Sequence, residues 1–95
     1  MTTETVPTLT TVASSNLLAV GYDPARETLY VAFKPDPRRP NPALYAYADV
    51  PPEVSELLWD VHRRGGSVGS AFNEHVKRAG FPYRRLPDLA AGAVS

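Results

Sequence analysis

The sequence predicts an α+β domain, in which a three-stranded antiparallel sheet is followed by two helices packed on one face. The first half of the chain contains segments in which apolar and polar residues alternate with the period of two that strands require. In the second half, apolar residues recur every three or four positions, as along one side of a helix. Strands that precede the helices, instead of alternating with them, favour an antiparallel sheet. A length of 95 residues suits a single domain.

The first two strands are expected at residues 15–22 and 28–34, and the second of them alternates more regularly. The residues between them begin with Asp23-Pro24, which is typical of a turn. Two strands joined by such a short turn pair with each other in antiparallel fashion. The sequence therefore predicts a hairpin at the start of the sheet.

A proline-rich segment follows at residues 34–42, with four prolines in nine residues. Proline lacks the N–H group that a sheet needs, so this segment is expected to be an extended loop facing solvent. One interpretation is a docking surface that carries Arg38 and Arg39. The simpler interpretation, which we favour, is a stiff connection between strands.

The third strand is expected at residues 44–49, where Tyr45 and Tyr47 share one face. Tyrosines on an exposed face could stack on nucleic-acid bases, whereas in a small sheet such rings more commonly cover the edge of the core. The edge of this strand could also pair with a second copy of the chain. A short final strand at residues 83–86 is a further candidate, and it would pair with a sheet edge.

The first helix is expected to begin at Pro51-Pro52-Glu53, because proline and an acidic residue both suit a first turn. Trp59 lies at the edge of its apolar stripe, where it either contacts a partner or packs partly buried against a loop. The stripe itself consists of Val54, Leu57, Leu58 and Val61.

The second helix is expected to follow the Gly65-Gly66 turn, with Ser67 as its N-cap, and to stop at Gly80. Free N–H groups and glycines at a helix start can hold an anion. Alternatively, the two glycines only form a sharp turn between helices. We favour the turn, because the stretch matches neither of the two common phosphate-binding glycine motifs.

Basic residues are concentrated in the second half of the chain, although the formal net charge is zero. Residues 61–85 contain six lysines and arginines and a single acidic residue, Glu74. Such a patch suits an anionic partner, although the whole domain lacks the high pI of a dedicated nucleic-acid binder. The candidate nucleic-acid or anion contacts are Arg63, Arg64, Ser67, Gly69, Lys77, Arg78, Arg84 and Arg85. The candidate stacking or partner contacts are Tyr45, Tyr47 and Trp59.

The residue types that catalysis or metal binding would need are scarce. Without cysteine, the chain has neither a disulfide framework nor a thiolate zinc site. His62 and His75 lack a placed third ligand, and no aspartate near Ser67 or Ser70 would orient His75 as a base. We therefore expect no enzymatic activity, no catalytic residues, no metal and no cofactor.

The N-terminus has neither the basic start nor the apolar run of a secretory signal, and no segment approaches the length of a membrane span. We therefore expect a cytoplasmic protein with no membrane contact.

Several short motifs follow one another between residues 14 and 86. They are Ser14-Ser15-Asn16, Gly21-Tyr22-Asp23, Leu29-x-Val31-x-Phe33, Tyr45-x-Tyr47, Val50-Pro51 before a helix that ends in Leu57-Leu58, Ser67-x-Gly69-x-x-Phe72-Asn73 and an aromatic residue, Tyr83. In their order and spacing they resemble the KTSC domain family, named after a C-terminal segment of some lysyl-tRNA synthetases. The expected organisation is a flexible arm at 1–13, a KTSC-like domain at 14–86 and a flexible tail at 87–95.

The resemblance implies a small α+β domain that occurs alone in bacterial and phage proteins or fused to larger ones, with RNA or nucleic-acid association as its expected activity. The chain departs from the family pattern in two places. Val68 stands where the family usually has a lysine, and the proline-rich loop is longer. If that lysine neutralises an anion in the family, only neighbouring arginines could replace it here.

Two functions are consistent with these features. The first is a non-catalytic module that associates with RNA or single-stranded nucleic acid through the basic residues between 63 and 85, with an affinity that falls steeply as salt rises. The alternative is a small protein-binding adaptor or inhibitor that uses the loop at 34–42 and Trp59, and its binding should depend little on salt. Such an adaptor could be encoded by a phage. A monomer or a weak homodimer is expected in either case.

Overall fold

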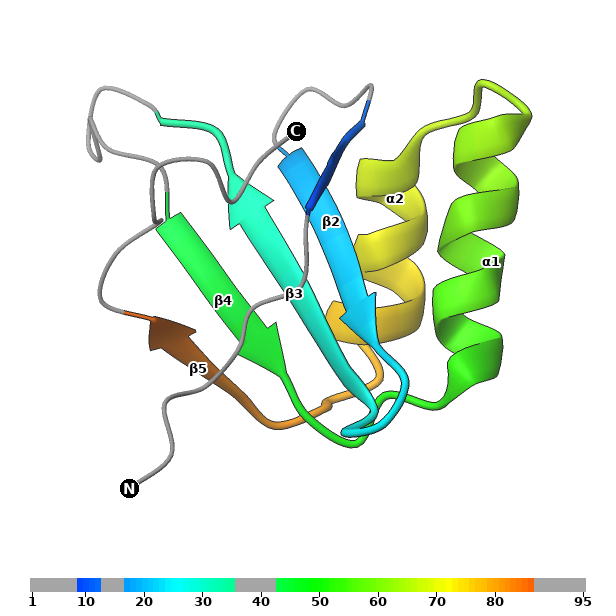
Figure 1. Cartoon of the computed structure of the whole chain (residues 1–95). Helices are drawn as coiled ribbons and strands as arrows, with labels where there is room; N and C mark the ends of the chain where they lie inside the picture. Colours follow the sequence, from blue (N-terminus) through cyan, green and yellow to red (C-terminus); the bar gives the residue numbers. More distant parts are fainter. Residues whose placement is uncertain (1–8, 13–16, 36–42, 87–95) are drawn as a thin grey trace.

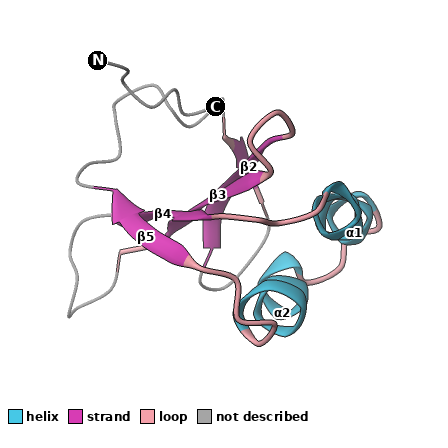
Figure 2. Cartoon of the chain, turned by 90° about the horizontal axis from the view of Figure 1, so that it is seen from below, coloured by secondary structure: helices cyan, strands magenta, loops and turns pink. Residues whose placement is uncertain are grey.

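The computed structural model describes residues 9–12, 17–35 and 43–86 of the chain. They form a five-stranded antiparallel sheet in the order β1-β2-β3-β4-β5, with two helices on the same side of it (Figures 1 and 2). The α+β class, the antiparallel sheet and the two helices that the sequence predicts are therefore confirmed. The elements are β1 (Thr10–Thr11), β2 (Leu17–Asp23), β3 (Thr28–Phe33), β4 (Ala43–Tyr47), α1 (Pro52–Arg63), α2 (Val68–Phe72), η1 (Asn73–Lys77) and β5 (Tyr83–Leu86).

Three of the predicted features lie wholly or mostly outside the described residues. They are the N-terminal arm up to residue 8, the tail at residues 87–95, and the part of the proline-rich loop at residues 36–42 that carries Arg38 and Arg39. The docking role expected of that loop stays a prediction.

The expected number of three or four strands is wrong, because β1 adds a fifth strand. Thr10 of β1 pairs with Val20 of β2, and the flanking residues Leu9 and Val12 are both buried. The sheet thus begins inside the stretch that we expected to be an arm. A strand of two residues has no period of its own, and it exists only because β2 offers it a partner.

The β2–β3 hairpin forms as predicted, and its turn is anchored to the segment before α1. The Asp23 side chain accepts a hydrogen bond from the N–H of Ala25 at 3.0 Å, as is typical of a turn that starts with aspartate. The N–H of Val50 donates to the carbonyl of Glu27 at 2.9 Å. The hydroxyl of Tyr22 donates to the carbonyl of the same Val50 at 2.6 Å. Together these bonds hold the hairpin end against the start of α1.

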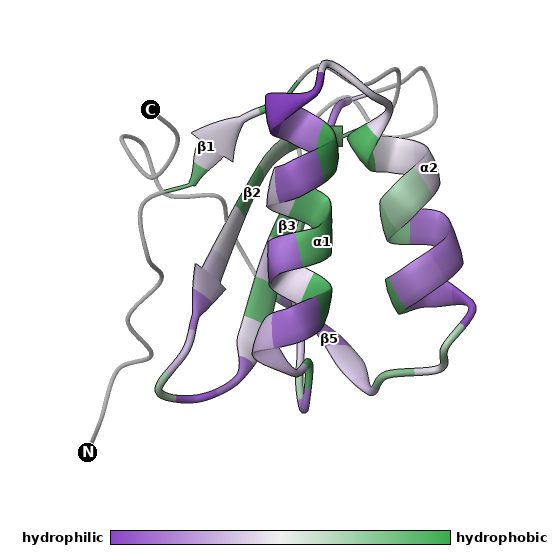
Figure 3. Ribbon diagram, turned by 90° about the vertical axis from the view of Figure 1, so that its right-hand side faces the viewer, coloured by the Kyte–Doolittle hydropathy of each residue, from purple (hydrophilic) through white to green (hydrophobic). Residues whose placement is uncertain are grey.

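The main core lies between the sheet and the helices. Tyr45 and Tyr47 face this core, so the tyrosine side of β4 is the side that the helices cover. Ser55 and Leu58 are the buried residues of α1, and the helix carries its apolar residues along one side (Figure 3). The fully or nearly buried members of this core are Val12, Leu17, Val20, Leu29, Val31, Tyr47, Val50, Leu58, Val68, Ala71, Phe72 and Val76.

The opposite face of the sheet is also buried and carries a second apolar cluster. Tyr30 and Ala32 of β3 are fully buried there, next to Leu44 and Ala46 of β4. Both faces of β3 and β4 are therefore removed from water, which explains why the alternation in β4 is between two kinds of apolar residue. Within the described residues, the helices lie on one of the two faces (Figure 2).

The second helix begins after Ser67, as predicted, but it is not a regular α-helix throughout. After five residues of α2 its hydrogen bonding widens to that of a π-helix in η1, where the N–H of Arg78 donates to the carbonyl of Asn73 at 3.0 Å. Gly80, with a φ of 82°, follows the helical segment. The chain then crosses below the sheet to enter β5 (Figure 1).

β5 confirms the candidate strand at residues 83–86 and covers the outer side of β4. Tyr83 pairs with Tyr47, and Leu86 pairs with Leu44. The edge of β4 is therefore occupied within the chain. Pairing with a second copy through residues 44–49, one of our expectations, is not available in this fold.

Candidate nucleic-acid interface

A group of aromatic rings gathers where β4 meets β5. The ring centroid of Tyr83 lies 5.9 Å from that of Tyr45 and 5.2 Å from that of Tyr47. Behind them, Phe72 of α2 packs edge-on against Tyr47 at 5.3 Å, and Phe33 packs edge-on against Tyr45 at 5.5 Å. The rings thus form a continuous layer from the helix-side core to the outermost strand.

Only the outermost ring of this layer is well exposed. Tyr83 has 63% of its surface exposed, Tyr45 is half-buried, and Tyr47 is 4% exposed. Burial, with a smaller effect from the neighbouring phenols of Tyr83 and Tyr45, raises the pKa of Tyr47 to about 12. Of the two predicted stacking residues, Tyr47 is therefore a core residue that does not present a free ring face. The accessible ring is Tyr83, which was not among the predicted site residues.

The two arginines of β5 lie on opposite faces of the strand, and one of them shares the face of the Tyr83 ring. Arg85 pairs with Tyr45 across the ladder, and Arg84 pairs with Ala46. Because successive side chains of a strand point to opposite faces, Arg85 lies on the same face as Tyr83, and Arg84 lies on the other. Both arginines are exposed.

Lys77 and Arg78 stand at the end of η1, just before the short segment that leads into β5. Both are exposed. Among the described residues, neither of them nor Arg85 takes part in an ion pair. Their charges are therefore available to an anionic ligand.

Arg63 and Arg64 do not belong to the same surface. They lie at the end of α1, on the opposite side of the molecule from β5 (Figure 1). Asp60, one turn earlier, holds both of them, at 2.7 Å from the Arg63 guanidinium and 3.8 Å from that of Arg64. The predicted basic patch is thus divided into two separate groups of cations.

The predicted anion site at the glycine turn is engaged within the chain. The Ser67 side chain accepts a hydrogen bond from the N–H of Ser70 at 3.1 Å and donates to the Ser70 hydroxyl at 3.1 Å. Gly69 is buried, and so is Val68, which is 1% exposed and part of the main core. At position 68 this chain therefore carries a packing residue in place of the lysine expected from the family.

Trp59 occupies a different surface from the β5 residues. It is half-buried on α1, with its ring centroid 6.0 Å from that of His62. It lines a pocket between α1 and the end of β2, to which Tyr22 also contributes. The position of Trp59 is therefore compatible with a partner contact, but not as part of the same site as Tyr83.

The histidines stay apart from any cluster of potential ligands. His75 contacts Glu74 at 3.7 Å, and His62 contacts Trp59. In the part of the chain that the structure covers, no three His, Cys, Asp or Glu residues are grouped so as to hold a metal ion. None of the helices there combines the length and the apolar character needed to cross a membrane.

The fold and these surfaces define a small α+β domain in which two helices lie on one side of an antiparallel sheet. A model of the KTSC domain family matches residues 13–81, and the chain belongs to this family. The chain is 37% identical over 73 residues to an uncharacterized protein of Stutzerimonas stutzeri (strain A1501), an alignment that covers 77% of this chain and 89% of that protein.

The fold is also similar to the crystal structure of a KTSC domain protein from Yersinia pestis. The TM-score is 0.60 at 26% sequence identity, and the similarity covers 82% of this chain and 94% of that chain. The resemblance found in the sequence motifs is therefore confirmed.

Proposed function

We propose that this chain is a non-catalytic module that binds single-stranded nucleic acid along β5. In this proposal Tyr83 stacks on a base, while Arg85, Lys77 and Arg78 contact phosphates. The observation that carries the proposal is the exposure of Tyr83, because 63% of a large aromatic side chain faces solvent at the edge of the sheet. Stacking on an exposed aromatic ring is a common way to bind single strands.

The packing behind Tyr83 supports this role. Its ring lies 5.2 Å from Tyr47 and 5.9 Å from Tyr45, and Tyr47 is itself fixed by Phe72. A ring that is already held in place loses little conformational freedom when a base stacks on it. A base would therefore bind to a preformed surface.

The charges near β5 support the phosphate contacts. Lys77, Arg78 and Arg85 have no acidic partner among the described residues, in contrast to Arg63 and Arg64, which share Asp60. A cation without a partner can neutralise a phosphate without first breaking an ion pair. Each such contact releases a counterion, so the affinity should fall as salt increases.

Fluorescence anisotropy with labelled single-stranded RNA and DNA, at low and at physiological salt, tests the proposal. Tyr83→Ala should weaken binding roughly 5-fold to 100-fold, the range expected for loss of one stacked base. Replacing both Lys77 and Arg78 by alanine should weaken binding and also reduce its salt dependence. The circular dichroism of each variant establishes that it is folded.

The double variant Arg63→Ala/Arg64→Ala is the matched control, since it also removes two cations but away from β5. It should bind as the wild type does. Absence of saturable binding at low salt would refute the proposal. An equal loss in the control variant would also contradict it, because the binding would then follow total charge and not the β5 surface.

A further inference from the structure

An open pocket of about 390 Å³ lies between the end of the β2–β3 hairpin and α1. It lies away from β5, so it goes beyond the nucleic-acid interface proposed above. Tyr22 and Trp59 provide aromatic walls, Pro24 and Pro52 provide rigid apolar edges, and Glu56 provides a carboxylate. None of the described residues that line it is a lysine or an arginine.

Ser55 is the unusual member of this pocket. It is 3% exposed, and within the part of the chain that the structure covers its hydroxyl makes no hydrogen bond. A buried hydroxyl without a partner costs free energy, and native structures rarely leave one in that state. Because Ser55 lines the pocket, a ligand placed there could supply the missing hydrogen bond.

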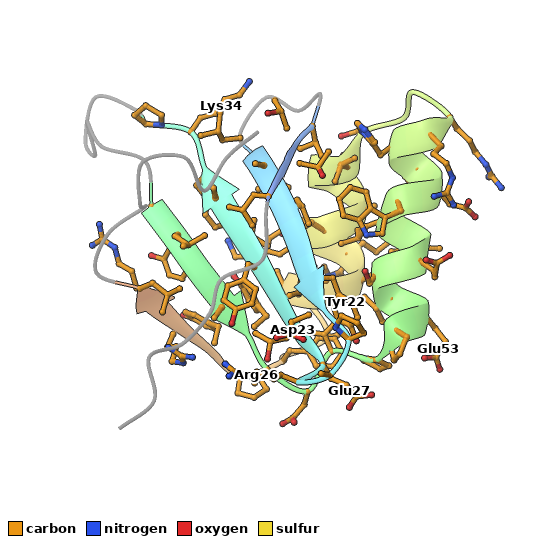
Figure 4. All side chains as sticks on the ribbon, viewed as in Figure 1. Tyr22, Asp23, Arg26, Glu27, Lys34 and Glu53 are labelled. Carbon is orange, nitrogen blue, oxygen red and sulfur yellow. The ribbon has the colours of Figure 1, made fainter. Side chains whose placement is uncertain are left out.

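The surroundings of the pocket favour a cation. Glu56 lines it, and Asp23, Glu27 and Glu53 lie around Tyr22 at its hairpin end (Figure 4). Burial, followed by the negative charges of Glu27, Glu53 and Asp23, raises the pKa of the Tyr22 hydroxyl. Of these carboxylates, Asp23 has a basic neighbour in Arg26, at 3.9 Å.

The orientation of the Tyr22 side chain is fixed by the hydrogen bond of its hydroxyl. Its hydroxyl donates to the carbonyl of Val50 at 2.6 Å, which ties the ring to the segment before α1. Its aromatic body therefore stays in the wall of the pocket while its polar atom is already satisfied. Among the side chains that line the pocket, the hydrogen-bond acceptors left for a ligand are the Ser55 hydroxyl and the Glu56 carboxylate.

We propose that this pocket binds the guanidinium group of an arginine side chain, presented by a peptide segment of a partner protein. A guanidinium is planar and weakly hydrated, so it can lie against the ring of Trp59. Its N–H groups donate to the Glu56 carboxylate and to the Ser55 hydroxyl. The proline edges contact the aliphatic stem and the adjoining peptide, which a volume of about 390 Å³ can accommodate together with the guanidinium.

The chain contains a built-in probe for this site, because Trp59 is its single tryptophan. The peptide acetyl-Gly-Arg-Gly-amide is titrated into the full chain while the tryptophan fluorescence is followed. A saturable change is expected. The same peptide with citrulline in place of arginine keeps the shape but loses the charge, and it should bind about tenfold more weakly.

Two variants test the polar contacts separately from folding. Glu56→Gln removes an exposed carboxylate and should weaken binding of the arginine peptide about tenfold. Ser55→Ala should weaken binding too, while its thermal midpoint stays the same or rises, because the lost hydroxyl has no partner among the described residues. Glu74→Gln, which removes an exposed carboxylate outside the pocket, should bind as the wild type does.

Several results would overturn the proposal. A flat fluorescence titration would do so, and so would equal affinity for the arginine and citrulline peptides. Unchanged binding by both Glu56→Gln and Ser55→Ala, or an equal loss in Glu74→Gln, would show that the pocket is not the site. Free arginine binding as tightly as the peptide would reject a peptide ligand and leave only recognition of a small molecule. All these outcomes are independent of the nucleic-acid titration, which reports on β5.

Discussion

Raising the pH above 10 is expected to destabilise the domain through Tyr47. Burial is the main reason that the pKa of this phenol rises to about 12 in the folded chain, whereas in the unfolded chain it is about 10. Between these two values the unfolded chain releases the proton while the folded chain keeps it. Ionisation therefore favours unfolding in this window. Below the window, the protonated phenol makes its full contribution to the stability of the folded chain.

The size of the effect follows from the width of the window. Each pH unit between the two pKa values is worth about 1.4 kcal/mol for one proton. A rise to about 12 makes the window roughly two units wide. By its upper end Tyr47 should have lowered the free energy of unfolding by about 2 to 3 kcal/mol, a large part of the roughly 5 to 10 kcal/mol expected for a domain of this size.

Urea unfolding of the wild type and of Tyr47→Phe, at a series of pH values from about 8 to 12, measures this effect around the two pKa values. Other titrating groups are common to both chains, so the difference between them isolates Tyr47. Near neutral pH the two should be close in stability, because the Tyr47 hydroxyl makes no hydrogen bond among the described residues. Above pH 10 the wild type should lose stability relative to the variant. A difference that stays constant across the whole pH range would refute the reasoning from burial.

Three further substitutions test individual contacts by thermal or urea unfolding. Val68→Lys should cost about 2 kcal/mol or more, since the side chain is 1% exposed in the main core; unchanged stability would mean that the longer side chain reaches solvent. Tyr22→Phe should cost about 1 to 2 kcal/mol by leaving the Val50 carbonyl without its 2.6 Å donor, and a midpoint equal to that of the wild type would show that water replaces the donor. Ser67→Ala should cost about 1 kcal/mol through loss of the cap on the Ser70 N–H, whereas a cost near zero would mean that α2 does not depend on this cap.

Local patterns were sufficient for most of the fold. The hairpin, the third strand and the first helix each have a period and a turn or start signal of their own, so they could be predicted without knowing their neighbours. The N-cap at Ser67 also forms as expected. The π-helical turn of η1 has no such signal, because the apolar spacing of an α-helix and of a single wider turn is nearly the same over five residues.

What the sequence could not settle depends on contacts between separate elements. β1 exists through its pairing with β2 and the burial of Leu9 and Val12. The choice of covered face was also undetermined, because β4 alternates tyrosines with Leu44 and Ala46 and both sets are suited to burial. A period of two identifies two faces, but it cannot say which of them the helices will cover.

The sequence likewise does not reveal which of the basic residues lie together in the folded chain. Arg63 and Arg85 fall within one basic stretch of sequence, yet α1 ends on one side of the molecule and β5 forms its opposite edge (Figure 1). Asp60, which pairs with Arg63, lies just before that stretch, so its charge does not enter the balance of residues 61–85. Tyr83 could have been recognised by combining two of our predictions, since an aromatic residue in a short final strand at a sheet edge is expected to be exposed.

The two proposed sites carry opposite charge, so each should select a different class of ligand. Lys77, Arg78 and Arg85 near β5 attract phosphates, whereas Glu56 and the carboxylates around Tyr22 repel them. A net charge of zero therefore does not describe either surface. The carboxylates near Trp59 should keep a nucleic acid away from the pocket, so its binding to β5 should leave the fluorescence of Trp59 unchanged. An arginine peptide in the pocket should likewise not compete with the nucleic acid. Competition between the two ligands would show that they share one site, in conflict with the separation of α1 and β5.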